Sequence, residues 1–402
     1  MVAGGGAAGF FAAITAAEHF PGARVTLYER GPQFLAKVRI SGGGRCNVTN
    51  ACADLDEFSR HYPRGGRALR APLRVFGPAD TIAWFARRGV PLKTEPDGRV
   101  FPVTDSSQTI VDCLCRAARS AGVELISDCG VLAARRRGEK LFEVMLASGQ
   151  TVRADRLMLA TGGCRSAAAG ALAVSLGHAL EAPVTSLFSL AIEVPWLRDL
   201  AGLSVARVEV TVPGTGLRQD GPLLLTHSGL SGPAILKLSA WGARTLHDMN
   251  YRFPLQINWL PQHDAQALTE ELRSRQVSQP ARQVANCPLP PLPLRLWEKL
   301  LLQAGVARET RWAGFSHAAR HRLIQQLQRT ELPVSGKSLN RDEFVTCGGV
   351  RLREVNFQTM ESRLCPGLFF GGELLDIDGL TGGFNFQAAW TTGWLAGRNI
   401  GK

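Results

Sequence analysis

The spacing of apolar and polar residues changes several times along the chain. From Phe10 to Phe20 apolar residues recur at helical spacing, and residues 24–29 (RVTLYE) then predict a strand. Residues 188–258 alternate apolar and polar positions between Gly and Pro turns, which predicts a small antiparallel sheet or barrel. Residues 264–330 predict mainly helix, broken by the stretch CPLPPLPL, which we interpret as a connector inside a domain.

Short apolar runs that end in glycine predict buried strands at two further places. Residues 157–163 (LMLATGG) form one, and residues 367–397 begin with another, which is followed by a Gly-rich loop and a helix. A helix capped by Ser106 or Ser107 and ending at Ala121 precedes a further strand, VELI. Strands that alternate with helices predict an α/β domain with a parallel sheet.

The glycines that follow residue 3 fit the pattern G-x-G-x-x-G. Gly4 permits a tight turn, Gly6 lets the backbone approach a pyrophosphate, and Gly9 lets a helix and a strand pack closely. Glu29 ends the next predicted strand, 20 residues after Gly9, where a carboxylate accepts hydrogen bonds from an adenosine ribose. The strand before the glycines holds only residues 1–3, so it is either unusually short or begins upstream. The pattern predicts a bound dinucleotide.

The C-terminal region indicates that this dinucleotide is FAD. No second fingerprint occurs, because Gly214 and Gly216 lack the third glycine and the following helix. Within residues 367–397 a strand leads to the sequence GGELLD, and a helix then begins at a second Gly pair. Two-part FAD domains close on the flavin and its ribityl chain with such a segment. The two halves of the site are therefore expected at opposite ends of the chain.

Six segments, taken in order, resemble the BaiN/YhiN-like family of FAD-binding oxidoreductases, also described as aminoacetone-oxidase-like. The resemblance implies an α/β fold with a Rossmann-like two-part FAD-binding domain, an inserted β-barrel-like piece and a helical piece. It implies bound FAD that is reduced by NAD(P)H, and it leaves the substrate open. Residues 164–178 depart from the family pattern, because they are shorter and more apolar. The six segments are SGGGRCNVTN, FPVTDSSQTIVDCL, LMLATGG, SLF, LLLTHSGLSGPAIL and FFGGELLDIDGLTGGFNFQAAWTTG.

The resemblance also implies domain boundaries and cofactor contacts. The FAD-binding domain is expected at 1–187 and 341–402, with the β-barrel-like piece at 188–258 and the helical piece at 259–340. The expected FAD contacts are Gly4, Gly6, Ala7, Ala8, Gly9, Glu29, Arg30, Lys37, Ser41, Gly43, Gly44, Arg45, Cys46, Asn47, Val131, Ala160, Thr161, Gly162, Gly372, Glu373, Asp376, Gly382, Gly383, Phe384, Asn385 and Gln387.

The segment SGGGRCNVTNAC allows two interpretations. Cys46 and Cys52 could form the redox pair of a flavin disulfide reductase, but such pairs have four intervening residues on a helix, whereas five intervene here. Asn and Thr between them favour a loop. The preceding residues 41–44 suit a nest of converging N–H groups for an anion, to which Arg45 adds charge and Asn47 a hydrogen bond to the flavin or ribityl edge. We favour the cradle and keep Cys46 as a candidate catalytic contact.

Other histidines and cysteines give weaker signals. His227 lies in a Gly/Ser-rich loop of the kind that can overhang a flavin, so it is a second candidate catalytic residue. His317 and His321 are four residues apart on a predicted helix, but no third ligand is evident, and we predict no metal site. Cys113 and Cys115 lie two apart on a helix and therefore point to nearly opposite sides.

Composition narrows the class of protein. The formal net charge is +12, but 39 of the 46 basic residues are arginines spread along the whole chain, so nucleic-acid binding is not favoured. The densest run, residues 135–137, is expected in a hairpin loop. No run of about 18 apolar residues predicts a membrane span, and the N-terminus lacks the pattern of a secretory signal. Nine scattered cysteines do not suggest a disulfide framework, which favours a reducing cytoplasm.

The sequence therefore predicts a cytoplasmic FAD-dependent oxidoreductase that acts on a small organic substrate. Two hypotheses from other classes stay open beside the disulfide reductase. One is a flavin-dependent RNA-modifying enzyme, for which a basic patch at the flavin face would be the signature. The other is a protein whose FAD is structural or lost, which the short first strand motivates.

Overall fold

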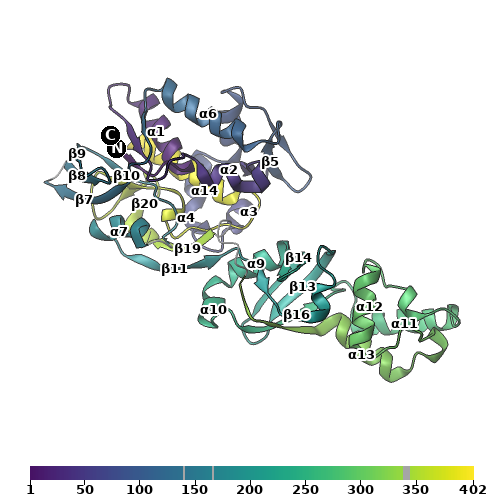
Figure 1. Ribbon diagram of the computed structural model, residues 1–402. Coiled ribbons are helices and arrows are strands. Elements are labelled where there is room, and N and C mark those ends of the chain that lie inside the picture. Colours follow the sequence, from purple (N-terminus) through teal and green to yellow (C-terminus); the bar gives the residue numbers. More distant parts are fainter. Residues whose placement is uncertain (139–140, 165–166, 338–344) are drawn as a thin grey trace. The chain divides into compact units, whose positions relative to one another are not determined.

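The computed structural model describes residues 1–138, 141–164, 167–337 and 345–402, which form two compact units (Figure 1). Unit 1 comprises Met1–Ser186 and Val345–Lys402, and unit 2 comprises Leu187–Phe344. Among the described residues, no helix is both long and apolar enough to cross a membrane.

Unit 1 is built on a seven-stranded sheet in the order β20-β21-β22-β10-β1-β2-β6. The five strands from β22 to β6 run parallel, while β21 and β20 are antiparallel to their neighbours. This parallel sheet confirms the predicted α/β class with a Rossmann-type core. Its strands are β1 (Val2–Ala3), β2 (Thr26–Tyr28), β6 (Glu124–Ile126), β10 (Leu157–Leu159), β20 (Val355–Asn356), β21 (Glu361–Ser362) and β22 (Leu368–Phe370).

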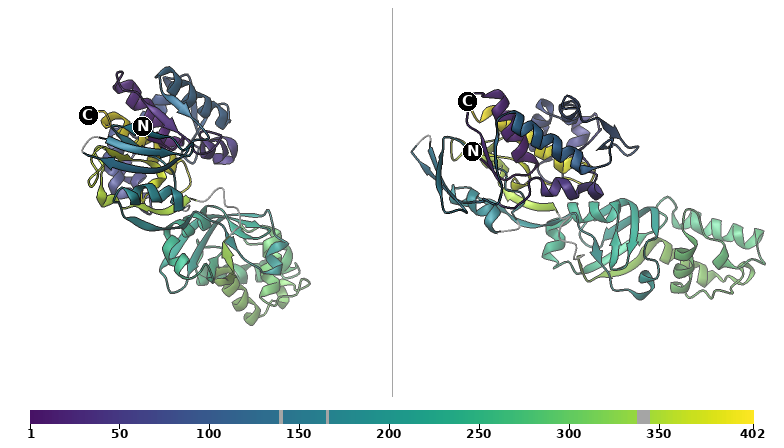
Figure 2. Two further views of the ribbon diagram at one scale, coloured as in Figure 1. Left: turned by 60° about the vertical axis from the view of Figure 1, so that its left-hand side comes forward. Right: turned by 45° about the horizontal axis from the view of Figure 1, so that its top comes forward.

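Helices from the two ends of the chain pack side by side on this sheet. α1 (Ala7–His19) lies along α14 (Phe384–Asn399), and the two termini lie close together in all views (Figure 2). Two glycines of α14 permit this close approach, because a Cβ on Gly393 would lie 2.4 Å from Ala8 O. The other helices of unit 1 are α2 (Ala36–Gly44), α3 (Leu55–Arg60), α4 (Gly66–Val75), α5 (Pro78–Ala86), α6 (Ser107–Ser120) and α7 (Ala167–Ser175).

Three small sheets complete unit 1. One of them, β7-β8-β9, corrects an expectation, since residues 135–137 pair with β8 and belong to a strand rather than a hairpin loop. Ser106 precedes α6, but its side chain makes no capping hydrogen bond; the Ser107 hydroxyl donates to Arg39 O instead. The strands are β3 (Thr49–Asn50), β4 (Leu92–Thr94), β5 (Arg99–Pro102), β7 (Val131–Arg137), β8 (Leu141–Leu146), β9 (Thr151–Ala154), β11 (Leu180–Ser186) and β19 (Val345–Val350).

Unit 2 contains an antiparallel seven-stranded sheet in the order β17-β16-β13-β14-β15-β12-β18. Alternate residues of β13 are buried, as the apolar–polar alternation predicts. Residues 330–337, expected in the helical piece, supply two of its strands. The strands are β12 (Leu190–Ala191), β13 (Ser204–Val212), β14 (Leu217–Thr226), β15 (Gly229–Ser231), β16 (Phe253–Asn258), β17 (Thr330–Val334) and β18 (Gly336–Lys337).

A helical piece is inserted between β16 and β17. Its helices gather beyond one end of the unit 2 sheet (Figures 1 and 2). Trp297 and Trp312 are fully buried in the core of unit 2, which explains why this proline-interrupted segment folds. The helices of unit 2 are α8 (Pro195–Arg198), α9 (Pro233–Trp241), α10 (Ala243–Asp248), α11 (Ala265–Ser278), α12 (Leu294–Gln303) and α13 (His317–Arg329).

Candidate functional site

The loop between β1 and α1 has the geometry that a pyrophosphate requires. Gly4 has a φ of +112°, and a Cβ there would lie 2.2 Å from Ala160 O. A Cβ on Gly9 would lie 1.9 Å from Gly4 O, so both positions need glycine. At Gly6, by contrast, no atom of the described chain lies within 4 Å of where a Cβ would stand. Open space therefore faces the N-terminus of α1, where the helix dipole favours a phosphate.

Glu29 follows β2 and reaches back to this loop. Its Oε2 accepts the Gly5 N–H at 2.7 Å, and its Oε1 accepts the Gly31 N–H at 2.8 Å. Each carboxylate oxygen has a further lone pair, so Glu29 can hold the loop and still accept a ribose hydroxyl.

Glu29→Ala is expected to weaken FAD binding by about 1–3 kcal/mol, the cost of losing a charge-assisted hydrogen bond. Fluorescence titration of the apoprotein with FAD measures the change. Glu124→Ala is the matched control, because Glu124 begins the neighbouring strand β6 and, among the described residues, its side chain bonds only Arg24 and Thr26 at the surface. Equal FAD affinity in the two variants would show that Glu29 does not hold the ribose.

Residues 41–44 form an irregular last turn of α2. Ser41 has extended backbone (ψ 151°), and the three following glycines all have positive φ. Gly43 and Gly44 are exposed, with no atom of the described chain within 4 Å of a would-be Cβ. The turn thus presents glycine backbone to open space, which fits an anion cradle.

Arg45 and Asn47, which flank this turn, are engaged within the chain. Arg45 forms ion pairs with Glu95 (2.7 Å) and Asp105 (3.5 Å) and covers the Phe101 ring at 3.9 Å. With its amide oriented to satisfy both ends, Asn47 donates to Thr49 O and accepts the N–H at the start of α14 (3.0 Å). Both side chains therefore hold the glycine turn in place. A direct contact of either side chain with the flavin stays a prediction.

The C-terminal half of the predicted site meets the N-terminal half at several points. Glu373 pairs with Lys37 and accepts the Thr346 N–H at 2.8 Å. Gly372 has a φ of +69°, and its Cβ would lie 3.0 Å from the Ala8 Cβ. Residues predicted from opposite ends of the chain are therefore brought together.

Gly383 begins α14 with a left-handed backbone, and its Cβ would lie 2.4 Å from the Thr49 carbonyl. Asn385 holds the preceding loop by exchanging two 2.8 Å hydrogen bonds with Gly379. Gln387 is fully buried, accepts from Thr49 Oγ1 and donates to Thr391 Oγ1. These three residues shape the loop and the helix start, and a contact of their side chains with FAD stays a prediction.

The remaining predicted contacts also lie on unit 1. Gly162 has a φ of +80° and open space where a Cβ would stand. Arg30 is exposed beside Gly130, one residue before β7. Part of the stretch 164–178 lies outside the described residues, at 165–166. The other positions are Ala7, Val131, Ala160, Thr161, Gly382, Asp376 and Phe384.

The thiol of Cys46 is poorly placed for redox chemistry. Cys46 is fully buried, and burial raises its pKa to about 12, so the nucleophilic thiolate is scarce at neutral pH. Cys52 is half-buried and donates to Asp54 O at 3.4 Å. Both are free thiols, as are the other seven cysteines. The geometry supports the cradle interpretation over a disulfide reductase.

Anaerobic dithionite titration is expected to consume two electrons per subunit, because flavin alone is a two-electron couple and a redox disulfide would add two more. Cys52→Ser should leave this value unchanged. A requirement for four electrons, lowered to two by either serine variant, would instead establish the disulfide reductase.

The other candidate residues lie on other elements of the two units. His227 is exposed in the turn between β14 and β15 of unit 2, and its catalytic role stays a prediction. His317 and His321 are exposed on α13, and among the described residues no group of three His, Cys, Asp or Glu is arranged to hold a metal. Cys113 is buried while Cys115 is half-exposed on the same helix, as their spacing predicts.

An ion pair between Arg64 and Asp378, which the sequence did not predict, holds the loop before α14. Arg64 binds the fully buried Asp378 through two nitrogens, Nε at 2.5 Å from Oδ1, and Ser186 Oγ donates to Oδ2 at 2.7 Å. Burial raises the pKa of the Asp378 carboxyl, while Arg64 and Ser186 counteract that shift. Tyr62 adds a hydrogen bond to Phe384 O at 2.7 Å. The segment YPR thus fixes the loop that leads into the site.

These features together define a class of protein. Gly6, Gly43, Gly44 and Gly162 leave room where side chains would stand, and Glu29 offers a ribose acceptor, so the residues present fit FAD. The parallel sheet with helices from both chain ends is a Rossmann-type dinucleotide-binding core.

The chain belongs to the family described as HI0933-like protein Rossmann domain, whose model matches residues 1–399. It is an FAD-dependent oxidoreductase. A 3-dehydro-bile acid delta(4,6)-reductase of Clostridium scindens is 30% identical over 99% of this chain and 97% of the relative. A ribosomal RNA dihydrouridine synthase of Escherichia coli is 31% identical over 100% of this chain and 97% of the relative.

Solved structures share the fold at low sequence identity. A 3-ketosteroid delta1-dehydrogenase from Sterolibacterium denitrificans superposes with a TM-score of 0.54 at 12% identity, over 99% of this chain and 98% of that chain. A 3-ketosteroid-delta4-(5alpha)-dehydrogenase from Rhodococcus jostii gives 0.51 at 16% identity, over 100% and 96%.

Proposed function

We propose that the protein reduces a carbon–carbon double bond conjugated with a carbonyl group, using FAD that NAD(P)H has reduced. The observation that carries the proposal is that two full-length relatives have different substrates but one kind of reaction. A delta(4,6)-reductase and a dihydrouridine synthase are both named for saturating such a ring double bond. We further propose that it works in the cytoplasm, in keeping with nine free thiols.

The geometry of unit 1 supports this chemistry because it can bind and orient the cofactor. FAD supplies the two-electron chemistry, while the protein supplies binding and orientation. The glycine positions with open space let the backbone come close, and Asn47 ties the cradle to the start of α14. The substrate must accept a hydride at one carbon and a proton at the next, a demand that enones and uridine both meet.

Two substrate classes remain within this proposal. A small cyclic enone agrees with the reductase relative, and uridine in RNA agrees with the synthase relative and with the net charge of +12. Anaerobic mixing separates them: NADH and NADPH are first tested for bleaching the flavin band. The reduced protein is then mixed with 4-androstene-3,17-dione or with a uridine-containing RNA transcript.

We expect one of these acceptors to reoxidise the flavin rapidly, so that the flavin band returns and a saturated product forms. A flavin that neither pyridine nucleotide reduces would overturn the proposed donor. A reduced flavin that dioxygen reoxidises but neither acceptor does would overturn the proposed reaction.

A further inference from the structure

The helical piece of unit 2 carries a concentrated positive charge. From Ala265 to Arg329 there are nine arginines and one lysine against four glutamates and no aspartate, a formal net charge of +6. Half of the net charge of the chain therefore falls in about one sixth of its length. Such a local excess favours an anionic ligand.

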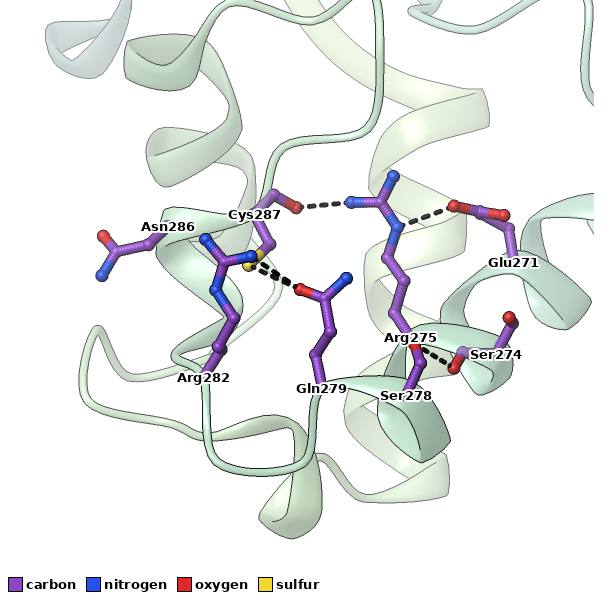
Figure 3. Close-up of a pocket in the computed structure, with 8 residues that line it drawn as sticks. All are labelled: Glu271, Ser274, Arg275, Ser278, Gln279, Arg282, Asn286 and Cys287. Atoms are coloured by element: carbon purple, nitrogen blue, oxygen red, sulfur yellow. Dashed lines mark hydrogen bonds and ion pairs between the residues drawn. The ribbon is translucent and has the colours of Figure 1, made fainter.

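A polar cavity of about 410 Å³ opens in this piece, beside α11 and the turn that follows it. Figure 3 shows the side chains of Arg275, Gln279 and Arg282 gathered at this cavity. Its lining consists of Glu271, Ser274, Arg275, Ser278, Gln279, Arg282, Asn286 and Cys287, of which only Cys287 is apolar.

The two arginines of the cavity have different surroundings. Arg275 donates Nε to Glu271 at 2.7 Å and Nη1 to the carbonyls of Cys287 and Pro288 at 3.0 and 3.1 Å, so it fixes the turn. Arg282 donates Nη1 only to the neutral Gln279 Oε1 at 3.0 Å, and no carboxylate of the described chain lies within 4 Å of it. Arg282 is exposed, and its guanidinium has no counter-charge among the described residues and keeps donors free for a ligand.

A further pair of arginines, Arg273 and Arg320, lies near the contact between α11 and α13. Arg320 on α13 is only 7% exposed, and its one side-chain hydrogen bond among described residues is to Gln276 Oε1 at 3.1 Å. Burial, and then the nearby charge of Arg273, lower the pKa of the Arg320 guanidinium. Neither Arg273 nor Arg320 forms an ion pair in the part of the chain that the structure describes, and Glu271 on α11 is engaged by Arg275. An anion bound beside α11 would relieve the repulsion between the two arginines.

We propose that this cavity, with Arg282 as its principal ligand and Gln279 as a second donor, binds a phosphate group. Guanidinium favours phosphate because its planar fork can donate two parallel hydrogen bonds to two oxygens. The phosphate can belong to the phosphodiester backbone of a nucleic acid or to a free phosphate. The site is independent of the reaction proposed above, so binding tests it without turnover.

The test uses the full-length, FAD-loaded protein and two probes. Fluorescence anisotropy measures binding of a labelled oligouridylate of about 12 nucleotides at several chloride concentrations. Thermal unfolding is followed in inorganic phosphate and in chloride at equal ionic strength. Arg282→Gln removes the charge of the site, and Arg87→Gln is the matched control, an exposed arginine of unit 1 with no ion pair among described residues.

If the phosphate is a phosphodiester, Arg282→Gln lowers oligouridylate affinity at least threefold and reduces the salt slope by about 0.7, while Arg87→Gln changes neither. If it is a free phosphate, inorganic phosphate raises the unfolding temperature of wild type and of Arg87→Gln but not of Arg282→Gln. Equal behaviour of wild type and Arg282→Gln with both probes would overturn the site.

Discussion

Asp378→Ala is expected to lower the free energy of unfolding by about 3–5 kcal/mol, the largest effect that we predict for a side chain remote from the fingerprint. Asp378 is fully buried, and Arg64, whose side chain is 16% exposed, binds both of its oxygens. Removal of the carboxylate leaves a mostly buried guanidinium without this counter-charge. Because Asp378 also anchors the loop before α14, FAD loading should fall with stability.

Chemical denaturation measures the effect against two further variants. Asp56→Ala is the control, since Asp56 is half-exposed and its ion pairs with Arg70 and Arg74 are long, at 3.7 and 3.8 Å. Asp56→Ala should lower the free energy of unfolding by at most about 1 kcal/mol. The double replacement Arg64→Met/Asp378→Leu should recover much of the loss, because no buried charge is left unpaired. An Asp378→Ala protein as stable as the Asp56→Ala protein would refute a stabilising role of the Arg64–Asp378 ion pair.

Gly383→Val is expected to abolish FAD loading and to destabilise the fold by several kcal/mol. The new Cβ would lie 2.4 Å from the Thr49 carbonyl, which is a steric clash within the protein. A β-branched residue would also be strained at a φ of +94°. The start of α14 must then move away from β3.

Flavin content after purification and the unfolding free energy of the apoprotein together measure the effect. Gly22→Val makes the same chemical change in an exposed turn, where no atom of the described chain lies within 4 Å of a would-be Cβ, and should be nearly neutral. A Gly383→Val protein with full FAD and wild-type stability would contradict the observed packing of α14 on β3.

Local rules made the fingerprint and the class of fold predictable from sequence. The G-x-G-x-x-G spacing has one structural solution, and in the structure Gly4 and Gly9 touch each other as that solution requires. The sequence could not show which polar residues contact the cofactor and which hold the backbone of the site in place. Arg45, Asn47 and Gln387 are residue types that can do either. Their partners became visible only in three dimensions.

Long-range polar pairs escaped prediction for a related reason. Arg64 and Asp378 are 314 residues apart, and no periodicity links them. The same holds for His178, which is buried between Glu354 (3.1 Å) and Ser362 (2.9 Å) and whose pKa burial lowers. Such contacts depend on how strands from both chain ends meet in one sheet.

We infer that FAD lies with its pyrophosphate over the start of α1. Gly6→Ala tests it most directly, since Gly6 has an ordinary φ of −91° and no neighbour for a Cβ in the described chain, so the apoprotein should lose less than about 1 kcal/mol of stability. FAD titration of both apoproteins is the measurement. We expect at least a tenfold weaker FAD affinity, or about 1.4 kcal/mol, with less than about 1 kcal/mol lost from the free energy of unfolding. Equal FAD affinity in wild type and Gly6→Ala would contradict it.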